Sequence, residues 1–252
     1  MRISYKKLKG TPVNATDGRC GTIHDVLFND ATMKLIYLVI DTGNWLPGRK
    51  TLISNQAVEG VNDLSSNFEI NLKLSNQQIE KSPPIDRDAP VSRQAEEELT
   101  NYFGWSPWSE LTVPISIQPS TPAPSVQEVD EKYNPPSPRQ NDPNLRSINE
   151  LIDYSLQDPN EEPIGLVHDL LVDTESWMIA YMAVNTRPWL PGGYRGIPTS
   201  QIAYIEFPTQ NIMLSMTSDE VGQCPNWKDL DFPLNNQDLR EFASNIQNAL
   251  HR

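Results

Sequence analysis

The chain contains an internal repeat. Residues 21–48 match residues 165–192 at a constant offset of 144, without a gap and with ten identities in 28 positions. Similarity at a fixed spacing is the signature of duplicated structural units. A chain of 252 residues is long enough for two modest cores. The sequence therefore predicts two tandem copies of one fold rather than a single large domain.

The stretch between the two copies is rich in proline. Residues 107–143 contain nine of the 22 prolines and few aliphatic residues. Such a segment cannot bury enough apolar surface to fold by itself. We therefore expect a first domain over residues 1–108, a Pro-rich linker over 109–144 and a second domain over 145–252.

Within each copy the pattern is typical of short β-strands. Residues 35–40 form a β-branched and aromatic run, and Asn29–Lys34 should join it as a hairpin to a strand that begins near Gly21. Lys50–Ile53 and Phe68–Leu72 bring the set to about five or six strands. Strands this short close most readily into a barrel, because closure removes exposed edges. The expected fold is mainly β: two small barrels with short flanking helices, joined by the Pro-rich linker.

Helix signals follow the strands of each copy. Ser75 with Gln78, and Thr217 with Glu220, have the spacing of a capping box. Ser92 can begin a longer helix with apolar residues on one face. A similar stripe follows the second copy, formed by Leu239, Phe242, Ala243, Ile246 and Leu250.

Charge separates the two copies and limits the partners. The net charge of −13 argues against nucleic acid and anionic lipid as ligands. Residues 1–81 carry ten Lys and Arg against eight Asp and Glu, whereas residues 145–225 carry three against eleven. The net charge is thus +2 for the first copy and −8 for the second, so the two surfaces have diverged. This divergence indicates either drift of solvated faces or copies that pair electrostatically or meet different partners.

The sequence also indicates a compartment. The first residues lack the apolar run of a signal peptide, and no window is apolar enough to cross a bilayer. We expect a cytoplasmic protein with no membrane span. Cys20 and Cys224 lie far apart without a CxxC partner, so we expect free, partly buried thiols rather than a zinc or dithiol site.

Each copy carries a His–Asp pair, His24–Asp25 and His168–Asp169. These residue types can bind metal or transfer protons. Adjacent strand residues point to opposite faces, however, so one pair cannot chelate one ion by itself. We favour a structural role, in which the imidazole fixes the hairpin or the following loop, and a ligand site is the alternative.

Each copy also carries a Trp-Leu-Pro-Gly loop, in which proline and glycine hold an aromatic ring in a fixed place. Such a ring is either packed within the molecule or used as an anchor at an interface. Arg49 and Lys50 would favour an acidic partner, including the acidic second copy. The candidate interaction residues are Trp45, Leu46, Pro47, Arg49 and Lys50 in the first copy and Trp189, Leu190 and Pro191 in the second.

These features together resemble the PRC-barrel domain, a family that includes the cytoplasmic part of the photosynthetic reaction-centre H subunit. The resemblance covers most of both copies. It depends on Asp17–Asp30, Tyr37–Gly43 and Trp45–Lys50, and the segment Tyr102–Trp108 is similar to the one that follows the barrel in a bacterial subgroup. The second copy departs from the family pattern at Arg187, Gly193 and Tyr194.

The resemblance implies a β-barrel used for binding or assembly, often dimeric, with no catalytic residues to carry over. No P-loop, nucleophile elbow, GxGxxG or HExxH motif occurs in the chain. We expect a non-catalytic interaction or scaffold protein without a cofactor, with barrel–barrel contact inside the chain, protein partners and a potential homodimer. The alternative is a small-ligand or metal sensor with a pocket between the barrels, centred on His24 and His168.

Overall fold

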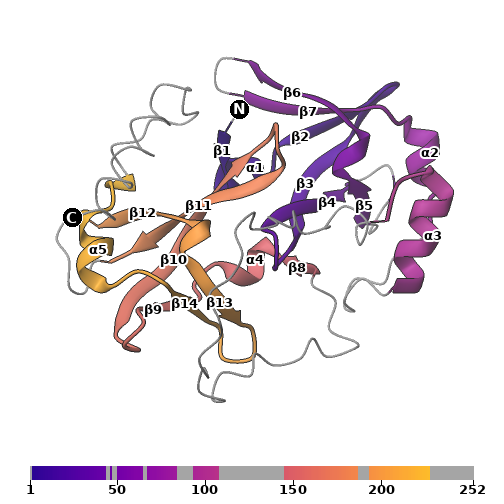
Figure 1. Ribbon diagram of the computed structural model, residues 1–252. Coiled ribbons are helices and arrows are strands. Elements are labelled where there is room, and N and C mark those ends of the chain that lie inside the picture. The colour runs from indigo at the N-terminus through magenta and orange to yellow at the C-terminus, as the bar shows by residue number, and fades with distance from the viewer. Residues whose placement is uncertain are drawn as a thin grey trace, which may run out of the picture.

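The computed structural model describes residues 2–43, 46, 50–64, 67–83, 93–107, 145–186 and 193–227. They form two halves that lie side by side, and the elements of the second half follow the order of the first (Figure 1). The first half comprises β1 (Arg2–Ser4), α1 (Tyr5–Leu8), β2 (Pro12–Ala15), β3 (Gly18–Asn29), β4 (Lys34–Asp41), β5 (Lys50–Ser54), η1 (Asn55–Ala57), β6 (Val58–Leu64), β7 (Asn67–Leu72), α2 (Asn76–Glu80) and α3 (Arg93–Phe103). The second comprises β8 (Leu145–Ser147), α4 (Ile148–Leu151), β9 (Ser155–Gln157), β10 (Pro163–Asp173), β11 (Met178–Asn185), β12 (Tyr194–Pro198), η2 (Thr199–Gln201), β13 (Ile202–Glu206), β14 (Asn211–Leu214) and α5 (Ser218–Gln223).

The predicted hairpin is confirmed, and its turn is fixed by a side chain. Asn29 Oδ1 accepts the backbone amides of Ala31 at 3.1 Å and Thr32 at 3.0 Å, and Met33 closes the turn with a φ of 57°. The second half repeats this turn with an aspartate. Asp173 Oδ1 accepts the amides of Glu175 and Ser176, and Trp177 has a φ of 53°.

A glycine stands near the start of each long strand, Gly21 in β3 and Gly165 in β10, because the neighbouring backbone comes too close for any side chain. A Cβ on Gly21 would collide with the carbonyl oxygen of Asp41, and one on Gly165 would collide with that of Asn185. This close approach explains why both of these positions, which are 144 residues apart in the chain, are glycine.

The 14 strands in the described part of the chain belong to one hydrogen-bonded sheet, which does not close on itself. Its path runs β13-β14-β9-β10-β11-β4-β3-β2-β7-β6, so the strands of the two halves are continuous. We expected two separate closed barrels. The structure shows a mainly β fold in which the halves share one sheet, joined where β11 pairs with β4. Each half also gives its first strand to the other.

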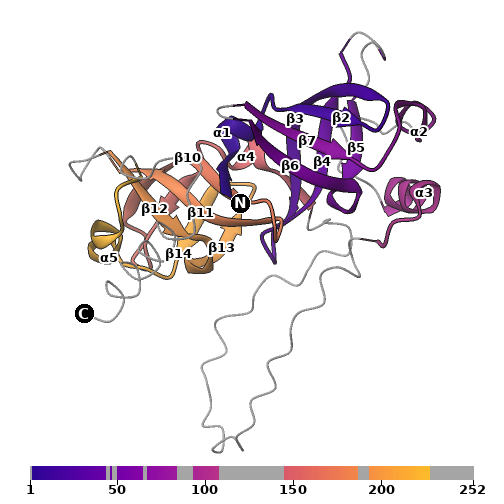
Figure 2. The ribbon, with the colours of Figure 1, turned by 90° about the horizontal axis from the view of Figure 1, so that it is seen from above.

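This strand exchange is reciprocal. β1 pairs antiparallel with β10, with Ser4 opposite Leu171, and β8 pairs antiparallel with β3, with Ser147 opposite Leu27. Leu27 and Leu171 are themselves related by the offset of 144. The two halves are therefore joined around a pseudo-twofold axis, and α1 and α4 lie beside each other at the junction (Figure 2).

The tips of the two hairpins meet at the same axis. Lys34 in β4 is opposite Met178 in β11. The amide of Leu35 donates to the carbonyl of Trp177 at 2.7 Å, and the amide of Ile179 donates to that of Met33 at 2.9 Å. These two bonds are also related by the offset, so the junction is symmetric at the level of the backbone.

One apolar core extends through both halves, from Ile3 in β1 to Val172 and Leu214 in the second half. A smaller cluster lies under α3, where Leu99 packs with Ile36, Tyr37 and Leu52. Continuous burial across the junction makes separation of the halves costly, because apolar surface would return to water.

Both predicted capping boxes are present at the starts of α2 and α5. The predicted helix after Ser92 is α3, in which Leu99 is buried but Tyr102 is exposed and donates its hydroxyl to the carbonyl of Gln78 at 3.0 Å. The Pro-rich linker 109–144 and the C-terminal stripe Leu239–Leu250 lie outside the described residues.

Candidate functional site

Asp25 lies buried at the junction, with four donors around its carboxylate. Its Oδ1 accepts hydrogen bonds from the Tyr5 hydroxyl at 2.7 Å, from the backbone amide of the adjacent Val26 at 2.7 Å and from the backbone amide of Asn149 at 3.3 Å. Its Oδ2 accepts the hydroxyl of Ser147 at 2.5 Å. Two of these donors come from the β8–α4 segment of the other half, so the carboxylate joins the halves.

Asp169 makes the corresponding contact in the second half. It accepts the amide of Lys6, the second residue of α1, at 3.2 Å and the amide of Leu170 at 2.8 Å. Asn149 is likewise the second residue of α4. Each aspartate thus binds the start of the helical turn donated by the opposite half, where free amide groups favour a negative charge.

The Tyr5 hydroxyl remains protonated at this centre. Burial, followed by the nearby charge of Asp25, raises the pKa of Tyr5 well above its usual value. The phenol is therefore a hydrogen-bond donor at every physiological pH, which suits a structural contact rather than proton transfer.

His24 points away from Asp25 toward the end of the Trp loop. Its Nε2 lies 2.6 Å from the Nζ of Lys50, the first residue of β5. Burial, and next the Lys50 charge, lower the pKa of His24 below 6.5. The neutral imidazole is then an acceptor for the lysine.

His168 occupies the corresponding place in the second half but has different neighbours. Its Nε2 lies 2.8 Å from the Nζ of Lys6, and its ring lies 4.3 Å from the ring of Tyr194, which replaces Lys50 at the offset of 144. The two histidines therefore do not converge on a common ligand.

No cluster of three or more His, Cys, Asp and Glu side chains that could hold a metal ion exists in the described parts of the chain. Cys20 and Cys224 are both buried and form no disulfide with each other, and burial raises the pKa of each thiol to about 12. These thiols are protonated at neutral pH and are poor nucleophiles.

Trp45, Pro47, Arg49, Trp189, Leu190 and Pro191 lie outside the described residues. The other two candidates are Leu46 and Lys50. The carbonyl of Leu46 accepts a hydrogen bond from the hydroxyl of Thr42 at 3.0 Å, and Lys50 contacts His24 as described above.

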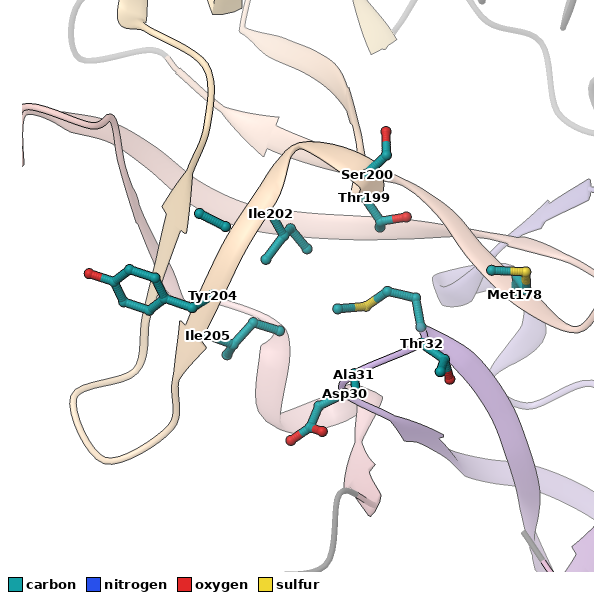
Figure 3. A pocket seen from close by; sticks show the side chains of 11 residues that line it. Asp30, Ala31, Thr32, Met178, Thr199, Ser200, Ile202, Tyr204 and Ile205 are labelled. Atoms are coloured by element: carbon teal, nitrogen blue, oxygen red, sulfur yellow. The ribbon is translucent and has the colours of Figure 1, made fainter. Parts of the chain in front are cut away.

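A pocket of about 490 Å³ lies between the two halves (Figure 3). The turn from Asp30 to Met33 lines it on one side, and Met178, the first two residues of η2 and the first four residues of β13 line it on the other. Asp30 is held there by Arg146, whose Nε lies 3.4 Å from its Oδ2. Neither His24 nor His168 is a lining residue, so this pocket is not the His-centred one that the sequence suggested.

The rim of the pocket exposes large apolar side chains. Met178 is 41% exposed and Tyr204 is 43% exposed, beside the half-buried Ile202 and Ile205. Sequence reasoning missed these residues because they look like ordinary strand residues. A residue-by-residue alignment of the two halves could have revealed them, since Tyr204 occupies the position that corresponds to Gly60 in the first half.

A second pocket of about 620 Å³ lies within the second half, along β9, the start of β10 and Ser218. The exposed Leu166 lines it.

No helix among the described residues is sufficiently long and apolar to traverse a bilayer.

Two comparisons with known proteins bear on identity. No curated protein matches the chain at a significant level. Residues 1–72 match the family model of the PRC-barrel domain, and the match ends at the last residue of β7. The N-terminal part of this chain is therefore a PRC-barrel domain.

Proposed function

We propose that this chain is a non-catalytic, cytoplasmic protein-interaction module built from two PRC-barrel units. Residues 145–227 form the second unit in this proposal, because their elements, turn geometry and buried aspartate correspond to those of the first. The exchanged strands hold the two units together.

The observation that carries the proposal is the apolar rim of the pocket between the units. Met178 and Tyr204 expose large apolar side chains to water beside a concave surface. Exposed apolar surface around a hollow is typical of protein–protein contact sites. The aspartates at the junction support a structural rather than a catalytic role, since their hydrogen bonds go to backbone amides and fixed hydroxyls.

Site-specific cross-linking in cells of the source organism tests this function. A photoreactive amino acid at Met178 should cross-link to another protein, and one at the exposed Glu59 in β6 is the matched control. A product of higher mass from position 178 alone supports the proposal. Equal products from both positions, or none from 178, contradict it.

The pocket also gives a second candidate function, binding of a small ligand between the units, because its volume of about 490 Å³ lies in the range of ligand sites. A thermal-shift screen of metabolites and metal ions separates the two candidates. A ligand that raises the melting temperature in proportion to its concentration, together with no cross-linked protein, would favour the sensor.

A further inference from the structure

β13 is the terminal strand of the shared sheet. It pairs antiparallel with β14, and among the described residues no backbone hydrogen bond joins it to any other strand. An edge of this kind presents unpaired N–H and C=O groups that can pair with another chain.

The pocket between the units runs along this open edge. Four consecutive residues, Ile202–Ile205, line it. Successive side chains of a strand point to opposite faces, so a hollow bordered by consecutive residues follows the strand edge rather than one face. Ile202 and Ile205 project toward the turn at Asp30, and Tyr204 projects to the other side (Figure 3).

The first unit shows that an open edge is not an automatic feature of this fold. β6 is the other terminal strand, and its bulge at Glu59 corresponds to the bulge at Ala203 in β13. β6 exposes the polar residues Glu59 and Asn62, whereas β13 exposes Ala203 and Tyr204 next to each other, followed by Glu206 at its end. Charged side chains discourage strand addition, so the uncharged stretch at Ala203 and Tyr204 is the more permissive edge.

The first unit binds a backbone segment at the place that corresponds to the start of the pocket in the second unit. Gln56 of η1 corresponds to the pocket residue Ser200 of η2. The Gln56 amide donates to the carbonyl of Ser106 at 3.1 Å and accepts the amide of Ser106 at 3.3 Å. The backbone of Ser106 is thus bound through both its N–H and its C=O groups at the corresponding place.

Charge complementarity defines the occupant. Residues 145–225 have a net charge of −8, from three Lys and Arg and eleven Asp and Glu, and Glu206 at the end of β13 is exposed. We infer that the free edge of β13 accepts, as an added strand, an extended segment of a partner protein with alternating apolar residues flanked by Lys or Arg. This inference rests on the proposed interaction function and names its partner class.

A designed peptide tests the inference with the full chain. The probe is a fluorescent Lys-Lys-Val-Thr-Val-Thr-Val-Lys-Lys peptide, whose affinity is measured by anisotropy. Two further peptides carry N-methyl groups on one or the other alternating set of residues. In strand addition only one set faces β13, so one methylated peptide should bind at least about tenfold more weakly and the other should bind like the probe.

Two variants of equal charge change locate the site. Ala203→Lys in β13 should weaken binding of the probe at least about tenfold, because a lysine on the edge repels the basic peptide and blocks pairing. Asn62→Lys in β6 should leave it unchanged. Hydrogen exchange of residues 203–206 should slow when the probe is bound.

The outcomes separate this inference from the proposed function. Equal binding of the two methylated peptides, equal loss from the two variants, or no binding by the wild type would overturn strand addition. A cross-linked protein at Met178 would still support an interaction role in each case. A photoreactive group at Tyr204 that captures a second copy or this chain's own residues would assign another occupant and also overturn the inference.

Discussion

Asp25 accepts a hydrogen bond from the backbone amide of Asn149, a residue 124 positions away in the other unit, at 3.3 Å. The bond from the amide of Lys6 to Asp169, at 3.2 Å, is its counterpart across the pseudo-twofold axis. Each unit is therefore held by a carboxylate that binds the first turn of a helix belonging to the other.

Replacement of this carboxylate should destabilise the whole chain. Asp25→Ala leaves the Tyr5 and Ser147 hydroxyls and two amides without their acceptor, and unsatisfied buried donors together cost about 3 kcal/mol. Urea unfolding should show a lower midpoint for this variant. Glu59→Ala, an exposed acid in β6, is the control, and equal midpoints for the two variants would contradict the role of Asp25.

The exchanged strands should keep the two units together without a covalent connection. A protease site inserted in residues 109–144 allows the chain to be cut after folding. Because β1 pairs with β10 and β8 pairs with β3, the two fragments should elute together from a sizing column and separate only in denaturant. Fragments that elute apart in native buffer would argue against the exchange.

Stability should depend on the protonation of His24. Burial and the Lys50 charge lower the pKa of His24 in the folded state below 6.5, while the unfolded chain takes up the proton near 6.5. The unfolded state therefore binds more protons as the pH falls through 6.5, and stability is lost in that direction. The melting temperature should fall from pH 7.5 to 5.5 less steeply in His24→Gln than in the wild type.

Lys50→Met provides the internal check on this mechanism. It removes the positive charge that lies 2.6 Å from the imidazole, so the pKa of His24 should rise toward its ordinary value. The pH dependence of Lys50→Met should then lie between those of the wild type and His24→Gln. A slope equal to that of the wild type would show that Lys50 has no part in it.

The paired glycines should not tolerate a methyl group. Gly21→Ala places Cβ against the carbonyl oxygen of Asp41, so the backbone must move and the unfolding free energy should fall by about 2 kcal/mol or more. Gly60→Ala in β6 meets no atom within 4 Å and is the matched control. Similar unfolding midpoints for the two would rule out the close approach.

Local signals in the sequence predicted local structure well. The hairpin turn at Asn29–Lys34 and the capping boxes at Ser75 and Thr217 depend on side chains that bond to backbone only a few residues away. Such contacts are encoded within a short window, so spacing alone reveals them. The PRC-barrel resemblance likewise depends on contiguous residues of the first unit.

The strand exchange could not be predicted in the same way. β1 and β8 have three residues each, too few for a periodic pattern. With their helical turns they align at an offset of 143 rather than 144, with Ser4/Ser147 and Leu8/Leu151 as the identical pairs. Which sheet such a strand joins depends on tertiary packing, and the exposure of Met178 depends on where the other unit lies.

The contrast between β6 and β13 has a consequence for binding stoichiometry. Two identical units around an axis would offer two equal edges and would bind two partners. The two edges differ in this chain: β6 exposes Glu59 and Asn62, whereas β13 exposes Ala203 and Tyr204 beside Glu206. If strand addition takes place at β13 alone, as we infer, the chain is monovalent, and a titration with the basic probe peptide should saturate at one to one.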